Sequence, residues 1–306
     1  MKILSLHITD RCNSACSFCV VASPLHAVDT VSYDRILEFL REHAGTGIDV
    51  VNLHGGEPTV HPKFDELLNE IHRLGYPELH LQTNAIRLHD DRFVGTLIDR
   101  GVRKFIISLH GDTPALQDAL TFTRGGFVKT IAGIENVVRR GIHVRTNTVI
   151  LKQNFSRLTE ICELACNLGV AHVNLSALHP VGSALFSRSS DMPSYTDMHA
   201  DVMKATALVL ERGKMLTLEG FPHCIIKERV EHQLTHEYRD IKMLSHDVVM
   251  TNYDEHMAGV LRAAGPPCQT CALKRECGGP YPQYVDYYGW NEFTPMEQLA
   301  TAGLSN

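Results

Sequence analysis

Short apolar stretches rich in β-branched residues alternate with amphipathic stretches over the first two thirds of the chain. The apolar stretches have the length and composition of strands, and the amphipathic ones have helical spacing. Strands are predicted at Ile3–Thr9, Asp49–His54, Glu78–Thr83, Lys104–His110, His143–Leu151 and His172–Leu178. Helices are predicted at Tyr33–His43, Phe64–Arg73, Asp91–Arg100, Lys129–Arg140 and Phe155–Leu168.

The order of these elements predicts the fold class. Strands that alternate with crossover helices form a parallel sheet, and right-handed crossovers curve it toward a barrel. The prediction is an α/β fold, a partial (β/α)6 barrel of the TIM type, with functional side chains at the carboxyl ends of its strands. After one more predicted helix at Tyr195–Arg212 the pattern ends. We therefore expect a barrel domain over residues 1–213 and a small cysteine-containing module over residues 214–306.

Composition narrows the classes of partner. The 306 residues are 44% hydrophobic, which is enough for one large core. A net charge of -6 without a long basic run gives no electrostatic reason to expect nucleic acid. No stretch reaches the roughly 18 apolar residues of a membrane span, and no signal-peptide core follows Lys2. We expect no nucleic-acid partner, no membrane contact and a cytoplasmic location.

Nine cysteines are present, and three of them follow the first predicted strand directly. Cys12, Cys16 and Cys19 form a C-x3-C-x2-C loop at the functional edge of the barrel. Such tight spacing favours a shared metal over disulfides. A cluster of four irons needs four ligands, so three thiolates would leave one iron open to another chelator. The alternative is a zinc site completed by His7 or His26.

The cysteine loop, with the aromatic Phe18 before its last cysteine, resembles that of the radical S-adenosylmethionine (radical SAM) superfamily. This resemblance implies a 4Fe-4S cluster that binds SAM through its open iron and cleaves it to a 5'-deoxyadenosyl radical. It also implies a reducing partner such as flavodoxin or ferredoxin. The run Gly55-Gly56-Glu57 after the second strand is similar to the family's GGE motif. There the small residues admit SAM, and the glutamate or nearby carbonyls take its ammonium group. Asn84 and Ser108, at the next two strand ends, resemble SAM-facing residues of the family.

Four further cysteines lie in the C-terminal third, and together they make a full ligand set. They are Cys224, Cys268, Cys271 and Cys277. Their C-x2-C-x5-C run resembles a shortened SPASM or twitch extension, which implies one auxiliary 4Fe-4S cluster serving as an electron relay or a structural staple. Zinc on the same thiolates is the alternative. Cys162 and Cys166 share an apolar helix face and are expected to fill core. The aromatic run Tyr281–Trp290 is expected to pack around the metal of the tail.

Three polar side chains near predicted strand ends are candidates for substrate chemistry. His110 or His179 could take a proton, because a histidine pKa lies near neutral, and Arg145 could hold a carboxylate or phosphate. Each of them is equally consistent with a hydrogen-bonded structural role. Arg124 is a candidate contact in the loop after the fourth strand. The other polar residues expected at strand ends are His54, Asn147, Asn174 and Ser176.

The substrate is the least determined part of the prediction. We favour an oxidoreductase or lyase that dehydrogenates, epimerises or decarboxylates a sugar, aminocyclitol or nucleoside in natural-product biosynthesis. The chain begins almost at the first strand, with no preceding domain expected for a leader peptide. The alternative is a maturase that modifies a ribosomal precursor peptide, and a third hypothesis is a non-enzymatic zinc protein. Resemblance to the molybdopterin enzyme that uses GTP is weaker, because that family ends in paired glycines and this chain ends Gly303-Leu304-Ser305-Asn306.

Overall fold

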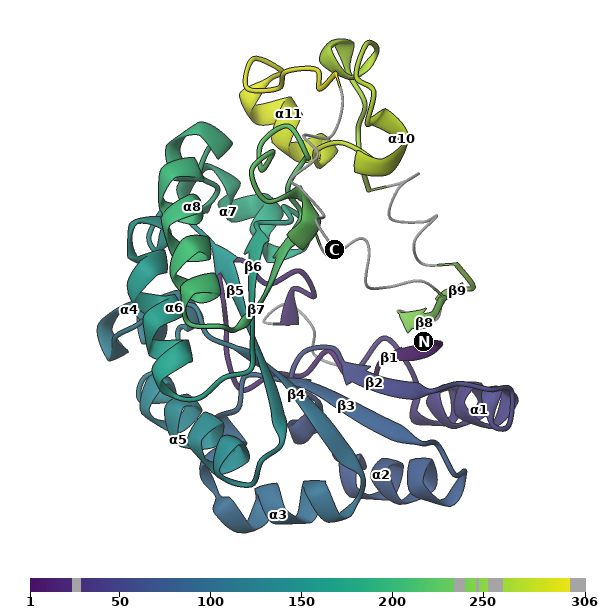
Figure 1. Ribbon diagram of the computed structural model, residues 1–306. Coiled ribbons are helices and arrows are strands. Elements are labelled where there is room, and N and C mark those ends of the chain that lie inside the picture. The colour runs from purple at the N-terminus through teal and green to yellow at the C-terminus, as the bar shows by residue number, and fades with distance from the viewer. Residues whose placement is uncertain (24–28, 234–239, 246–247, 253–260, 298–306) are drawn as a thin grey trace, which may run out of the picture.

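A computed structural model describes residues 1–23, 29–233, 240–245, 248–252 and 261–297. Its centre is one sheet of nine strands in the order β7-β6-β5-β4-β3-β2-β1-β8-β9, and the sheet is not closed (Figure 1). Neighbouring strands are parallel except β8 and β9. The strands are β1 Ile3–His7, β2 Val50–His54, β3 Glu78–Thr83, β4 Val102–Ser108, β5 His143–Ile150, β6 His172–Ala177, β7 Met215–Glu219, β8 Ile241–Ser245 and β9 Val248–Met250.

Helices cover the outer face of this curved sheet, and two short ones lie beyond the carboxyl ends of β6 and β7 (Figure 1). The helices of the barrel region are α1 Tyr33–His43, α2 Phe64–Arg73, α3 Asp91–Asp99, α4 Pro114–Thr121, α5 Gly126–Arg139, α6 Leu158–Asn167, α7 Ser183–Asp191 and α8 Tyr195–Glu211. The tail carries α10 Lys274–Cys277 and α11 Pro282–Tyr288. Among the described residues, no helix is long and apolar enough to pass through a lipid bilayer.

The two faces of the strands differ in polarity. In β6 the apolar Val173 and Leu175 belong to the hydrophobic core, whereas His172, Asn174 and Ser176 alternate with them. Because side chains on a strand alternate between faces, the polar set lies on the face opposite the helices. The inside of the partial barrel is therefore polar, and it can carry chemistry.

The predicted fold class is confirmed, and the six predicted strands correspond to β1–β6. Strands β7, β8 and β9 were not predicted, and β7 and β8 extend the sheet at its two sides beyond residue 213. The division of the chain at residue 213 stays a prediction. The Ser-rich segment Ser187–Ser190 lies within α7. Cys162 and Cys166 are buried in the core, as predicted.

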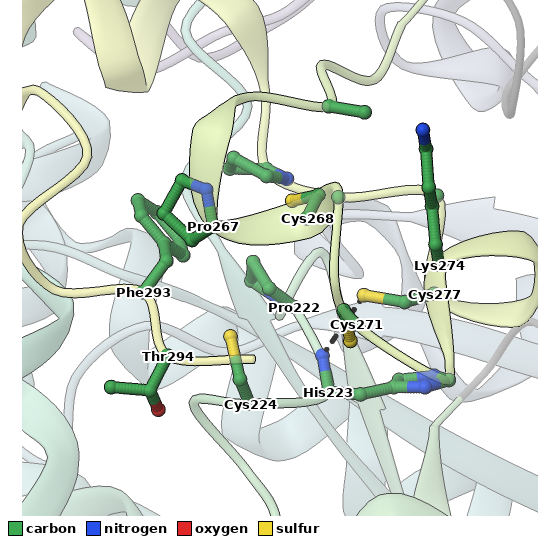
Figure 2. Close-up of a pocket in the computed structure, with 14 residues that line it drawn as sticks. Pro222, His223, Cys224, Pro267, Cys268, Cys271, Lys274, Cys277, Phe293 and Thr294 are labelled. Carbon is green, nitrogen blue, oxygen red and sulfur yellow. Dashed lines mark hydrogen bonds between the residues drawn. The ribbon is translucent and has the colours of Figure 1, made fainter. Parts of the chain in front are cut away.

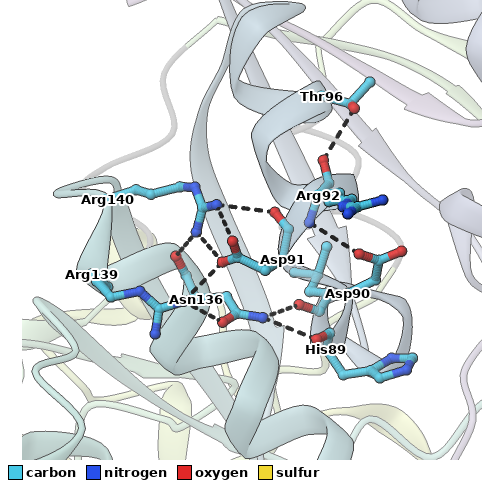
Figure 3. Close-up of polar contacts among 9 residues, drawn as sticks. His89, Asp90, Asp91, Arg92, Thr96, Asn136, Arg139 and Arg140 are labelled. Carbon is cyan, nitrogen blue, oxygen red and sulfur yellow. Dashed lines mark hydrogen bonds and ion pairs between the residues drawn. The ribbon is translucent and has the colours of Figure 1, made fainter.

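A polar cluster joins α3 to α5 on the outer face (Figure 3). Arg139 and Arg140 both contact Asp91, with a nitrogen-to-oxygen distance of 2.8 Å for Arg139. Asn136 donates to the carbonyl of Leu88 at 2.9 Å and so closes the short helix at Ile86–His89. The ion pairs of the two arginines are solvent-exposed and contribute little to stability. The buried hydrogen bond donated by the Asn136 side-chain amide, in contrast, fixes the chain after β3.

Aromatic residues attach the tail to the barrel. The Tyr284 hydroxyl accepts a hydrogen bond from the buried backbone nitrogen of Tyr195 at 2.7 Å, and the two rings lie 4.2 Å apart. Tyr288 donates to the carbonyl of Met192 at 2.7 Å. Tyr281 stacks on His179. Three tyrosines of the run expected around the metal of the tail thus pack on the barrel, namely Tyr281, Tyr284 and Tyr288.

Replacing Tyr284 by phenylalanine should lower the free energy of unfolding by about 1–3 kcal/mol, since the buried Tyr195 N–H loses its acceptor. Tyr287→Phe is the matched control, because the Tyr287 side chain is largely exposed. Denaturant titration of both variants measures the effect. An equal, negligible loss in both would show that the Tyr284 contact does not hold the tail.

Candidate active site

The Cys12–Cys19 loop follows β1 and lies at the carboxyl edge of the sheet. Burial raises the pKa of the Cys12 thiol to about 11. The pKa of Cys16 is raised further, mainly by burial and then by the neighbouring Cys19 and Cys12 thiols. The raised pKa values of Cys12 and Cys16 disfavour ionisation of these two thiols by themselves, whereas a bound metal would ionise them. This donor set fits an iron-sulfur cluster held by three thiolates.

Because Gly55 and Gly56 have no side chain, the end of β2 can lie in direct contact with the backbone just before Cys12. The nitrogen of Gly56 donates to the Thr9 carbonyl at 2.7 Å, and that of Glu57 donates to the Arg11 carbonyl at 2.8 Å. A Cβ at Gly55 would lie 2.3 Å from the Thr9 oxygen, and one at Gly56 would lie 2.3 Å from the Arg11 oxygen. The glycines were predicted to admit SAM. In the structure the close approach that excludes a side chain is to the protein's own backbone.

Glu57 is fully buried, and neighbouring residues already bind its carboxylate. It accepts from the Thr59 nitrogen and hydroxyl at 3.1 and 2.6 Å, from the Thr83 hydroxyl at 2.8 Å and from the Asn84 nitrogen at 2.8 Å. Burial raises the pKa of Glu57, and these bonds oppose the rise. Four donors match the lone-pair sites of a carboxylate. The geometry therefore favours a clamp between β2 and β3 over a direct contact with SAM, and the predicted contact stays untested.

Asn84 connects the end of β3 to the cysteine loop. Its amide nitrogen donates to the Asn13 side chain at 2.6 Å and lies 3.9 Å from the Cys12 sulfur. The Glu57 carboxylate fixes the backbone of Asn84 by accepting its N–H. Ser108, at the end of β4, lies opposite Asn147 in the register of β4 and β5. The predicted SAM-facing residues Asn84 and Ser108 thus lie at the same edge of the sheet as the cysteines. Phe18 packs edge-on against His110, with ring centres 4.8 Å apart.

Helix α7 holds the other end of the cysteine loop, a contact that the sequence analysis missed. The Ser17 hydroxyl donates to the buried carboxylate of Asp191 at 2.5 Å, and Ser187 donates to the Ser17 carbonyl at 3.0 Å. The Ser183 nitrogen donates to the Cys19 carbonyl at 2.9 Å. A run of serines is typical of loops. Only the fold shows that here they hold the Cys16–Cys19 segment.

Burial lowers the pKa of both candidate proton acceptors. Burial lowers the pKa of His110 to about 4, and its Nδ1 accepts from the Val149 nitrogen at 3.1 Å. The neutral ring of His110 then carries its proton on Nε2, so this nitrogen is a hydrogen-bond donor and not an acceptor. Burial and the charge of Arg262 lower the pKa of His179 to about 4. These settings favour structural roles for both, because a general base works best with a pKa near the working pH.

Arg145 belongs to a polar network inside the barrel on β5, β6 and β7. The Asn174 amide donates to Asn147 at 2.6 Å and to Glu219 at 3.1 Å, and Arg145 lies 4.0 Å from the Glu219 carboxylate. Ser176 donates within the same group. The predicted strand-end residues of β5 and β6 therefore do converge. Glu219 was missed because β7 was not predicted.

The four tail cysteines line one cavity of about 430 Å³, including its opening (Figure 2). Figure 2 shows their sulfurs turned toward this shared space. The backbone nitrogens of His223 and Met296 donate to the sulfurs of Cys277 and Cys271 at 3.2 and 3.4 Å. Hydrogen bonds to ligand sulfur are a feature of iron-sulfur sites. Cys224, about 44 residues before Cys268, lines the same cavity as the other three cysteines, and the role of the four as metal ligands stays a prediction.

Of the two histidines proposed to complete a zinc site at the first loop, His7 already has another partner. His7 is buried and bonded through Nε2 to Asp10 at 2.9 Å, and His26 lies outside the described residues. In the described part of the chain, no three His, Cys, Asp or Glu side chains are arranged to hold a single metal ion. Arg124 is exposed in the turn before α5.

The arrangement defines a class of protein: a partial βα barrel with one three-cysteine loop at its mouth and a four-cysteine cavity in its tail. The family model described as "Radical SAM superfamily" matches residues 6–165. The chain belongs to the radical SAM superfamily. Its cofactors are accordingly a 4Fe-4S cluster and SAM, and it is a radical SAM enzyme.

Curated relatives share moderate identity with this chain. The PqqA peptide cyclase of Ruegeria pomeroyi is 30% identical over 197 residues, 63% of this chain and 51% of the relative. The GTP 3',8-cyclase of Clostridium perfringens is 30% identical over 224 residues, 71% of this chain and 66% of the relative. The chain thus matches only about half to two thirds of the length of these relatives.

Solved structures share the fold. Streptococcus suis SuiB bound to S-adenosylmethionine has a TM-score of 0.68 at 16% identity, covering 97% of this chain and 77% of SuiB. The protein anSMEcpe with bound AdoMet and the Cp18Cys peptide has a TM-score of 0.64 at 13% identity, covering 97% of this chain and 92% of that one. Both likenesses include the tail as well as the barrel.

Gly56→Ala should displace the cysteine loop and lower its iron loading, because the new methyl group would collide with the Arg11 carbonyl. Displacing the loop by about 1 Å should reduce SAM cleavage roughly 100-fold. Gly95→Ala is the control, since nothing lies near its Cβ position. Iron content after anaerobic reconstitution, and 5'-deoxyadenosine formation, measure both variants. Full iron loading and cleavage in Gly56→Ala would contradict this role of the glycine.

Proposed function

We propose that this chain abstracts a hydrogen atom from a small, polar substrate at the mouth of the barrel. Cys12, Cys16 and Cys19 hold the SAM-binding cluster in this proposal, and the Asn84 side chain orients the loop. When bound, the cluster and SAM supply a 5'-deoxyadenosyl radical. The surroundings of the cofactor are formed by Phe18, Gly55, Gly56, Glu57 and Ser108. Glu57 acts indirectly, through the residues that it fixes.

The polar interior of the barrel is the observation that supports a small hydroxylated or aminated substrate. Asn147, Asn174, Ser176 and Glu219 form a connected set of hydrogen bonds across three strands, with Arg145 beside it. Such convergent polar groups fix the orientation of small ligands. A sugar, aminocyclitol or nucleoside has the matching hydroxyl or amino groups. The reaction in this proposal is a dehydrogenation, epimerisation or decarboxylation in natural-product biosynthesis.

A peptide is the second candidate substrate, and the comparisons support it about as well. A curated relative is a peptide cyclase, and SuiB and anSMEcpe have been solved with peptides bound. Comparing the small-molecule and peptide fractions of a cell extract separates the two candidates. The fraction that raises 5'-deoxyadenosine formation above the substrate-free rate contains the substrate class, and stimulation by the peptide fraction alone would overturn our first choice.

The tail cysteines in this proposal hold one auxiliary 4Fe-4S cluster. The four thiols are the complete ligand set, so its irons would have no position for a substrate. Backbone donors to Cys271 and Cys277 would stabilise thiolate charge. The cluster would serve as an electron relay or a staple, and reduced flavodoxin or ferredoxin is the proposed external electron donor. A cytoplasmic location stays a prediction.

Cys16→Ala should abolish 5'-deoxyadenosine formation from SAM and a strong reductant, because two thiolates cannot hold the open-iron cluster. Cys166→Ala is the matched control, since that cysteine is buried in the core of the barrel. Chromatography of anaerobic reactions measures the product. Cleavage by Cys16→Ala at the rate of the control would refute the assignment of the loop.

Cys277→Ala should remove about four irons per chain while leaving the SAM-binding cluster loaded. Iron, sulfide and zinc analysis of anaerobically purified protein measures the change. Wild-type protein that contains one zinc and only four irons would show that the tail holds zinc. Equal iron in the variant and the wild type would show that Cys277 is not a ligand.

A further inference from the structure

Glu219 places a carboxylate in the mouth of the barrel that neither cysteine site uses. It is the last residue of β7 and pairs in register with Ser176 of β6. Two residues earlier, Thr217 ends a row of strand neighbours that runs through Asn174 and Asn147 to Ser108. Residues two apart on a strand share a face. Glu219 therefore faces the barrel interior, one step nearer the mouth than the row that contains the predicted SAM-facing Ser108.

The surrounding residues orient this carboxylate through one of its two oxygens. Oε2 accepts from Asn174 at 3.1 Å and from Ser176 at 3.0 Å. Thr217 donates to the Asn174 side-chain oxygen at 2.6 Å, which fixes the amide so that its nitrogen faces Glu219. Within the described residues, Oε1 accepts no hydrogen bond. The carboxylate is held in place while half of its acceptor capacity remains available.

Exposure distinguishes Glu219 from the residues that hold it. Its side chain is 42% exposed, whereas Asn174 is fully buried and Ser176 nearly so. A carboxylate that only faced solvent would gain little from three buried polar side chains, because water satisfies it equally well. Buried groups that fix one exposed acceptor are the arrangement expected of a preorganised ligand site.

The chemistry of the Glu219 carboxylate determines which groups of a ligand it can bind. Oε1 accepts hydrogen bonds and donates none, so it suits a hydroxyl or ammonium group and repels phosphate or carboxylate. Such charge-assisted bonds are stronger than neutral ones. His110, predicted to act on the substrate, uses its Nδ1 for a backbone nitrogen, which leaves Glu219 as the better placed acceptor.

We propose that Glu219 is a substrate-binding residue whose Oε1 accepts a hydrogen bond from a hydroxyl or amino group of the substrate. This inference rests on the proposed function, because it places the substrate in the mouth of the barrel. It adds that the part of the substrate next to β7 is a hydrogen-bond donor. Asn174 and Ser176 are positioning residues that act through Glu219.

The test uses reconstituted holoprotein with SAM and three ring probes: inositol, an aminocyclitol of the same ring, and fully O-methylated inositol, which cannot donate. Saturation-transfer NMR measures their dissociation constants. Inositol and the aminocyclitol should bind the wild type and the methylated ring should not. Glu219→Ala should weaken both by about tenfold or more. Glu219→Gln keeps the shape of the side chain and one acceptor oxygen. It should weaken binding of the aminocyclitol more than binding of inositol if an ammonium group is the preferred donor. It should weaken binding of both probes alike if a hydroxyl group is the preferred donor.

Glu228→Gln is the matched control, because Glu228 is 43% exposed and pairs with His199, outside the network of the mouth. It should bind all probes as the wild type does. Failure of both donor probes to bind, unchanged binding in Glu219→Ala, or equal binding of the methylated ring would each overturn the inference. Wild-type protein that forms no 5'-deoxyadenosine would instead refute the proposed function, so the two failures are distinguishable.

Discussion

The contact between the ends of β1 and β2 is the constraint on which the site depends. Two backbone hydrogen bonds tie Gly56 and Glu57 to Thr9 and Arg11, and they form only where no Cβ intervenes. This contact fixes where Cys12 begins the cysteine loop. Parallel strands bring all their carboxyl ends to one edge, so the same contact places the loop beside Asn84. The reactive loop is thus positioned by backbone geometry at its start and by α7 at its end.

Among the described residues, two of the sets of polar groups that connect neighbouring strands bear on the site. Glu57 joins β2 to β3 below the cysteine loop, and all its acceptor sites are used inside the protein. Glu219 ends the second set, on β5 to β7, and keeps one oxygen available. The first set is suited to hold a rigid cofactor loop, and the second is suited to bind a ligand. The tail cavity lies beyond these strands and brings its own four thiols.

Local pattern was sufficient for the barrel and for both groups of cysteines. β1–β6 have clear apolar runs, and cysteine spacing is a property of the sequence alone. β7–β9 lie beyond the six strand–helix repeats, and β8 pairs with a strand more than 200 residues away, so the repeating pattern gave no signal for them. The clamp by α7 was missed because serine runs favour loops locally and become helical here through contacts with Ser17. The burial and hydrogen-bond partners of Glu57 and His110 could not be predicted because both are tertiary properties, and the roles expected of these residues stay predictions.

The central claim is that the Cys12–Cys19 loop leaves one iron open to SAM. Electron paramagnetic resonance of the reduced, anaerobically reconstituted protein tests it most directly, with spectra recorded before and after SAM is added. The account predicts that SAM changes the signal of one cluster and leaves the signal of the tail cluster unaltered. Spectra that are identical with and without SAM would contradict it.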